Sequence, residues 1–223
     1  MRRLGRMAGG FVSRHARCIS GIPSSGLREK LAEIMPAKQA ALKEMKTEHG
    51  YKIVDKVTID QLIGGARSIK SMLWETSLLD PVEGIRFRGY TIPELQETLP
   101  SYKGGPSEGE PTPEALLWLL LTDEIPTKAQ ADALTAELHA RAKLPDHVEP
   151  MIRGFPKGMH PVTQLSSAIL AMQTDSVFAN EYAKGTNKAK YWEHTYEDMM
   201  NLLARVSSAH PHLPRRSTAE PSS

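Results

Sequence analysis

The chain has 223 residues, a formal net charge of +2 at pH 7, 24% charged residues and 40% hydrophobic residues. This composition is ordinary for a globular protein, and the length allows a sizeable core. The single cysteine, Cys18, excludes an internal disulfide and a cysteine-rich zinc site. The longest purely apolar run, Ala115 to Leu121, is far too short to cross a bilayer.

The start of the chain is basic and lacks acidic residues. Residues 1–28 contain no Asp or Glu, and five arginines lie among small and apolar side chains in the first 17 positions. This pattern is typical of a mitochondrial transit peptide, although a disordered basic tail that binds acidic surfaces has the same composition. We assign residues 1–24 to a transit peptide, which predicts a location in the mitochondrial matrix. The rest of the chain suggests no nucleic-acid-binding surface.

The next part is predicted to be helical. Apolar residues recur at helical spacing from Leu27 to Ile34, after Ser24 and Ser25, which can cap the helix start. Pro36 interrupts this pattern. The pattern then continues as a second helix or a kinked extension that stops near Gly50.

Two short strands are predicted after this helical part. Residues 56–59 read as a brief strand, and residues 84–90 alternate between apolar and basic side chains. Such short pairings do not make a large sheet. Residues 101–113 are rich in Gly, Pro, Ser and Glu, which indicates an exposed loop.

Helices return at Thr112-Pro113, a typical helix start that opens the apolar run 115–121. Because this run is apolar on every face, we expect it to be buried. A capping box at Thr127 to Gln130 precedes another helix.

Periodic apolar residues also predict helices over residues 161–172 and 196–206. In the second of these, the predicted core stripe is Tyr196, Met199, Leu203 and Val206. Residues 207–223 show no periodic pattern and are predicted to be a disordered tail.

The most specific string of the sequence is Glu75 to Gly89, which follows Gly64-Gly65-Ala66-Arg67. On physical grounds, a glycine pair beside an arginine suits close backbone approach and phosphate pairing, although a simple turn is the commoner reason for such a pair. The string resembles the pattern of eukaryotic mitochondrial citrate synthases, N-terminal half only, and the resemblance runs from about Ser25 to Val206. Further blocks that fit the pattern follow in order at residues 92–94, 113–120, 125–127, 141–145, 160–166, 190–193 and 196–198.

This resemblance implies a mainly α fold: part of the citrate synthase large helical domain, over residues 25–206, with two short β-strands near the N-terminus. The family is an acyltransferase of the tricarboxylic acid cycle that condenses acetyl-CoA with oxaloacetate to citrate, and it works as a homodimer. The resemblance therefore implies acetyl-CoA as a co-substrate, with no tightly bound cofactor and no metal. Methylcitrate-forming relatives remain an open alternative.

The resemblance also implies two basic contacts to the CoA phosphates. Arg67 matches a family arginine that reaches these phosphates, and Lys188 stands where the family often has a second arginine. Lysine keeps the charge but loses the bidentate fork of arginine. The alternative for both residues is a solvated basic side chain. Arg86 and Arg88 are predicted to be structural, on the outward face of one strand.

No catalytic residue is assigned. The reaction needs a base that removes a methyl proton from the thioester, and donors that stabilise the enolate and polarise the ketone. In the family an aspartate and two histidines do this, and the positions that match them lie beyond the end of this chain. His210 and His212 have no matching context, and His160 is predicted to be a structural helix start.

Three hypotheses follow. The chain is a truncated form of an enzyme that is inactive by itself. Alternatively, it is a non-catalytic helical remnant that binds CoA weakly or associates with full-length subunits. The third hypothesis is a fragment that does not fold. In the family, later helices bury much of the apolar run 115–121 and of the stripe at the end of the chain. Without those helices these apolar side chains would be exposed to water, so we predict marginal stability for the isolated chain.

We predict that the basic leader is removed by a cut between Arg17 and about Ser24, because small residues follow the last leader arginine. N-terminal sequencing of the protein from isolated mitochondria checks this prediction. An intact Met1 or Arg2 in that sample would rule it out.

Overall fold

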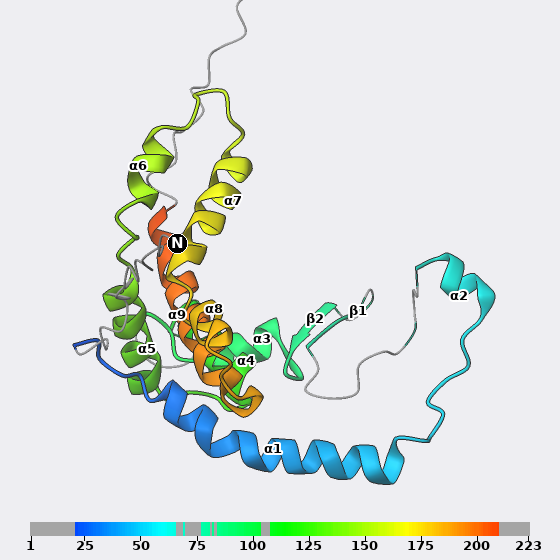
Figure 1. Cartoon of the computed structure of the whole chain (residues 1–223). Helices are drawn as coiled ribbons and strands as arrows, with labels where there is room; N and C mark the ends of the chain where they lie inside the picture. Colours follow the sequence, from blue (N-terminus) through cyan, green and yellow to red (C-terminus); the bar gives the residue numbers. More distant parts are fainter. Residues whose placement is uncertain are drawn as a thin grey trace, which may run out of the picture.

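The computed structural model describes residues 21–65, 69, 77–80, 82, 84–103 and 108–209. Helices dominate this part of the chain, which confirms the predicted mainly α fold (Figure 1). None of the described helices has the length and apolar character that a membrane span requires. The elements are α1 (Leu27–His49), α2 (Ile59–Ile63), β1 (Leu78–Asp80), β2 (Gly84–Phe87), β3 (Tyr90–Thr91), α3 (Ile92–Thr98), α4 (Pro113–Thr122), α5 (Lys128–Arg141), α6 (Val148–Arg153), α7 (Pro161–Ala171), the 3-10 helix η1 (Met172–Asp175), α8 (Val177–Ala183), the 3-10 helix η2 (Lys188–Lys190) and α9 (Tyr191–Ala209).

Helix α4 lies between two apolar clusters, which explains why its sequence is apolar all round. Trp118, 1% exposed, packs in a cluster with residues of α1, α5 and α9. Ala115 and Leu119, both 0% exposed, belong to a second cluster with residues of α3 and α5. The predicted burial of this run is therefore confirmed, and the cover comes from helices within the described residues.

A third apolar cluster joins α6, α7 and the end of α9. It contains Val148 and Ile152 of α6, Ala168 of α7, Met172 of η1 and Ala209 of α9. Because Ala209 is 0% exposed and still helical, α9 continues past Val206, where the sequence analysis placed the start of a disordered tail. Residues 210–223 lie outside the described residues.

Helix α1 is continuous through Pro36, so the predicted alternative of a kinked extension is confirmed and that of a separate second helix is wrong. Figure 1 shows this helix changing direction in its first half, as expected where a proline removes a backbone hydrogen bond. At its start, Gly26 adopts a left-handed φ of 79°, and the N–H of Leu27 donates to Oγ of Ser25 at 3.3 Å. Gly50 ends the helix, as predicted.

The small sheet has three antiparallel strands in the order β1-β2-β3. The predicted strand 84–90 is split into β2 and β3 by a two-residue turn at Arg88 and Gly89, whose φ angles are 51° and 90°. Two consecutive positive φ angles are typical of the tight hairpin turn that matches strand twist. The prediction therefore missed both this turn and strand β1.

The strand predicted at residues 56–59 is wrong. Thr58 is the N-cap of α2, and its hydroxyl accepts from the N–H of Gln61 at 3.3 Å while the Gln61 side chain accepts from the N–H of Thr58 at 2.9 Å. This capping box satisfies the local backbone groups in a helical start. It outweighs the β propensity of the branched side chains.

The buried face of α9 differs from the predicted stripe. Tyr196 is buried and Met199 is partly buried in the first cluster, but Leu203 is 42% exposed. Met200, at 0% exposure, and Ala204 face the core instead. The predicted stripe has spacings that alternate between three and four residues. The buried face instead takes every fourth residue from Tyr196, which gives Met200 and Ala204.

The burial of α9 yields a stability prediction. Met200→Ala should lower the free energy of unfolding by about 2–5 kcal/mol because it leaves a cavity in the first cluster. Leu203→Ala should cost less than about 1 kcal/mol because this side chain is already partly solvated. Urea denaturation followed by circular dichroism compares the two variants. A larger cost for Leu203→Ala than for Met200→Ala would mean that the predicted stripe is the core face.

Candidate functional site

Of the two residues predicted to contact CoA, only Lys188 lies in the described part of the chain. Lys188 is exposed and opens η2, directly after Asn187. The Asn187 side chain accepts from the N–H of Ala189 at 2.9 Å, which fixes the backbone of this turn. Arg67 lies outside the described residues, so a shared ligand for both remains a prediction.

Two histidines of the described part, His147 and His160, contact main-chain groups at helix ends. His160 is the N-cap of α7, and its Nδ1 accepts from the N–H of Val162 at 3.2 Å, which confirms its predicted role as a helix-start residue. The Nε2 of His147 lies 2.9 Å from the carbonyl oxygen of Ala171, where α7 ends. Within the described residues, no group of three or more His, Cys, Asp and Glu side chains could hold a metal ion.

The two arginines of the hairpin bind main-chain oxygens, which agrees with a structural role. Nη1 of Arg86 donates to the carbonyl oxygen of Gly89 at 3.0 Å, across the turn. Nε of Arg88 donates to the carbonyl oxygen of Leu120 at 3.0 Å, in the last turn of α4. Arg88 thus lies in the turn and not on the outward face of a strand, and it joins the sheet to the central helix.

The Arg141 guanidinium at the end of α5 is the centre of a buried polar network. Its side chain is 6% exposed and contacts two carboxylates: Nη2 lies 2.7 Å from Oε1 of Glu137, and Nη1 lies 2.8 Å from Oε2 of Glu197 on α9. Nη1 also donates to Oδ1 of Asn201 at 3.0 Å. In the sequence, Arg141 belongs to the family block at residues 141–145. Its spacing of four residues from Glu137 was the available signal.

This network also fixes the entry of the chain into α1. The buried N–H of Ser25 donates to Oε2 of Glu137 at 2.9 Å, so the segment before α1 is bound to the same carboxylate as the arginine. Burial lowers the pKa of the Arg141 guanidinium, but the hydrogen bonds and charges of Glu197 and Glu137 outweigh it, and the pKa is raised. The arginine stays charged and structural.

Three consecutive residues of α9 have separate structural roles. The Tyr196 ring packs in the first apolar cluster, and Glu197 pairs with Arg141. The Asp198 carboxylate accepts from the N–H groups of Val177 at 2.7 Å and Phe178 at 3.1 Å, at the start of α8. Negative charge at a helix N-terminus is stabilising. Asp198 therefore stabilises the start of α8.

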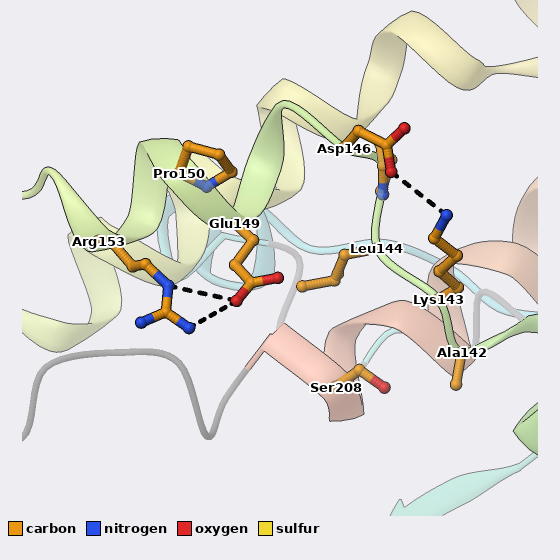
Figure 2. A pocket seen from close by; sticks show the side chains of 9 residues that line it. Ala142, Lys143, Leu144, Asp146, Glu149, Pro150, Arg153 and Ser208 are labelled. Atoms are coloured by element: carbon orange, nitrogen blue, oxygen red, sulfur yellow. Dashed lines mark hydrogen bonds and ion pairs between the residues drawn. The ribbon is translucent and has the colours of Figure 1, made fainter.

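A cleft of about 480 Å³ lies between the loop after α5, helix α6 and the end of α9 (Figure 2). Figure 2 shows its charged side chains in pairs: Arg153 with Glu149, at 2.6 Å from Nη2 to Oε1, and Lys143 with Asp146, at 3.3 Å from Nζ to Oδ1. These exposed pairs add little stability. Ser208 also lines the cleft, and its hydroxyl donates to the carbonyl oxygen of Ala204 at 3.5 Å.

Comparisons with known proteins identify relatives. Residues 65–222 match the protein family described as "Citrate synthase, C-terminal domain". The chain is 47% identical over 196 residues to "Citrate synthase, mitochondrial" of Saccharomyces cerevisiae, which covers 88% of this chain and 40% of the relative. The protein of the same name from Neurospora crassa is 50% identical over 191 residues, covering 86% and 40%. That from Daucus carota is 49% identical over 190 residues, covering 85% and 40%.

The chain therefore spans about two fifths of the length of the curated relatives it matches. The family match includes residues 207–222, which the sequence analysis had set apart as a divergent tail.

The buried phenol of Tyr196 yields a prediction on pH. Burial, and next the charge of Glu137, raise the pKa of the Tyr196 phenol from its ordinary value of 10.0. Above pH 10 the unfolded chain loses this proton while the folded chain keeps it, so the unfolded state binds fewer protons. The free energy of unfolding should then fall by up to about 1.4 kcal/mol per pH unit, until the folded phenol also ionises.

Urea denaturation at pH 9 to 11 checks this, with Tyr196→Phe expected to show a shallower alkaline fall. Tyr102→Phe, at a position that is 89% exposed, is the matched control and should behave as the wild type. Identical pH profiles for wild type and Tyr196→Phe would contradict the prediction.

Proposed function

The chain belongs to the citrate synthase family, and from this membership we propose that its protein condenses acetyl-CoA with oxaloacetate to give citrate and free CoA. The observation that supports this most is the identity of about half with relatives named mitochondrial citrate synthase, over more than four fifths of the chain. The same names and the acid-free arginine-rich start support a transit peptide and a place in the mitochondrial matrix.

We propose that these residues provide the helical scaffold and part of the CoA contact. We propose further that the proton-transfer groups lie in the part of the relatives' sequences that this chain does not match. In the described part, His147 and His160 bind helix ends, and Asp198 caps α8. These contacts give all three side chains a structural role, which supports placing the base for the thioester methyl group elsewhere. A polypeptide of these 223 residues alone is therefore proposed to be inactive.

For CoA we propose Arg67 and Lys188 as contacts to the phosphates. The exposure of Lys188 on a turn that Asn187 fixes supports its part of this proposal, since the ammonium is open to an anionic ligand. A lysine provides charge without the bidentate hydrogen bonding of an arginine, so Lys188 should contribute less than Arg67 to the affinity for CoA. As in the family, we propose assembly as a homodimer and no tightly bound cofactor.

The alternative is a non-catalytic helical body that binds CoA weakly or joins full-length subunits. One observation favours it over a fragment that does not fold. The described residues close three apolar clusters by themselves, with Trp118, Leu134, Ile152 and Met200 almost completely buried. Burial of this kind is what a folded body requires.

A thiol-release assay with acetyl-CoA and oxaloacetate tests the proposal, on protein from a host without its own citrate synthase. The 223-residue chain should release CoA at the rate of buffer, since loss of a whole catalytic set costs several orders of magnitude. A chimera of residues 1–206 and the uncovered part of the yeast relative should turn over. Arg67→Ala in the chimera should raise KM for acetyl-CoA more than Lys188→Ala.

Two results would contradict this proposal. Turnover by the 223-residue chain above buffer would place catalytic groups within it. A folded chimera without condensing activity would separate this chain from the reaction of its relatives.

A further inference from the structure

The turn between α8 and α9 carries an excess of positive charge. Residues 181–190 contain one acidic residue, Glu181, and three lysines, Lys184, Lys188 and Lys190. Nζ of Lys184 lies 2.5 Å from Oε1 of Glu181, which neutralises this lysine. Lys188 and Lys190 are exposed, and neither has an ion-pair partner among the described residues. The turn therefore presents two uncompensated ammonium groups to solvent.

Side chains before these two lysines hold the backbone of the turn. Oε2 of Glu181 accepts from the hydroxyl of Thr186 at 3.1 Å, and the Glu181 carbonyl oxygen accepts from the N–H of Thr186 at 3.2 Å. Between them, Gly185 has a φ of 79°, a left-handed value that glycine adopts without steric cost. The hydrogen bond from Lys184, and next that from Thr186, lower the pKa of Glu181, so this carboxylate stays ionised at neutral pH.

Asn187 holds the part of the turn on which Lys188 lies. Its Oδ1 accepts from the N–H of Ala189 at 2.9 Å, and its carbonyl oxygen accepts from the N–H of Lys190 at 2.9 Å. Because these two N–H groups of η2 are already satisfied, the group that this turn offers to an anion is the Lys188 side chain and not the start of the 3-10 helix.

Three aromatic rings attach the ends of the same segment to the neighbouring helices. The ring centroid of Phe178 on α8 lies 5.2 Å from that of Tyr191, the first residue of α9, in an edge-to-face arrangement. The Tyr182 centroid lies 6.0 Å from that of Tyr191 and 5.9 Å from that of Phe178. Such pairs stabilise packing beyond the area that they bury. Both ends of the turn are therefore anchored, and the Asn187 cap orders the residues between them.

We propose that Asn187 is a positioning residue for CoA, which orders the backbone beneath Lys188 before the ligand arrives. The Lys188 ammonium then meets a CoA phosphate on a backbone that is already in place, so less conformational entropy is lost on binding. Serine has an oxygen that can cap the same N–H, whereas alanine has none. This inference rests on the proposed CoA contact of Lys188, and not on the condensation reaction.

Binding of CoA to the full 223-residue chain tests the proposal. Titration of the isotope-labelled chain with CoA, followed by its amide NMR signals, gives the Kd of each variant. Asn187→Ala should raise the Kd about three- to tenfold, whereas Asn187→Ser should stay within about twofold of the wild type. In a Lys188→Ala background, Asn187→Ala should add less than about twofold, because residues that act through one contact are not additive.

Asn180→Ala is the matched control. Nδ2 of Asn180, on α8, donates to the carbonyl oxygen of Ser176 at 2.8 Å, so this variant also removes an exposed amide and a hydrogen bond to the main chain, but away from η2. It should leave the Kd for CoA unchanged. Circular dichroism and urea unfolding of every variant should stay close to the wild type, because the substituted side chains are exposed.

The proposal is overturned if Asn187→Ala binds CoA as tightly as the wild type, if Asn187→Ser binds as weakly as Asn187→Ala, or if the loss is the same without Lys188. It is also overturned if Asn187→Ala does not fold, which would give Asn187 a purely structural role. A wild-type chain that does not bind CoA would remove the Lys188 contact and this inference together, while turnover of the chimera decides the proposed reaction separately.

Discussion

The helical body depends on a buried charge that must be neutralised where three segments of the chain meet. The Arg141 guanidinium at the end of α5 contacts Glu137 on its own helix and Glu197 on α9, while Glu137 also accepts the N–H of Ser25 before α1. A buried guanidinium is tolerated only when its donors are paired. These contacts therefore specify which faces of α5 and α9 meet, and where the N-terminal segment joins them.

Around this ionic centre the apolar packing has a simple order. Helix α4 separates two clusters, with Trp118 on one side and Ala115 and Leu119 on the other. Helix α9 connects the first cluster, through Met200, to the third cluster, through Ala209. Two helices thus carry most of the internal contacts. The polar contacts of Arg88 and Asp198 attach the hairpin and α8 to them, because each satisfies backbone groups at a helix end.

Family membership and the described geometry give this chain a role that is mainly architectural. Two side chains of the types that proton transfer requires, His160 and Asp198, accept backbone N–H groups at helix starts. The apolar surface left open on the described residues includes residues 51–63 after α1, together with Leu170 and Leu202. The Arg141 network is fully paired, whereas the Tyr196 hydroxyl and Oε1 of Gln164 are buried without a hydrogen-bond partner among the described residues.

The sequence by itself determined the features that depend on neighbouring residues. These are the helix caps at Thr112, Thr127 and His160, and the burial of the apolar run in α4. The sequence string from Glu75 to Gly89 was also specific enough to identify the family. Contacts between distant segments decided the rest. The face of α9 depends on Arg141, 56 residues away, which holds Glu197, so spacing alone selected Leu203 where Met200 is buried. A side chain's partner in another helix leaves no periodic signal, and only the tertiary structure shows it.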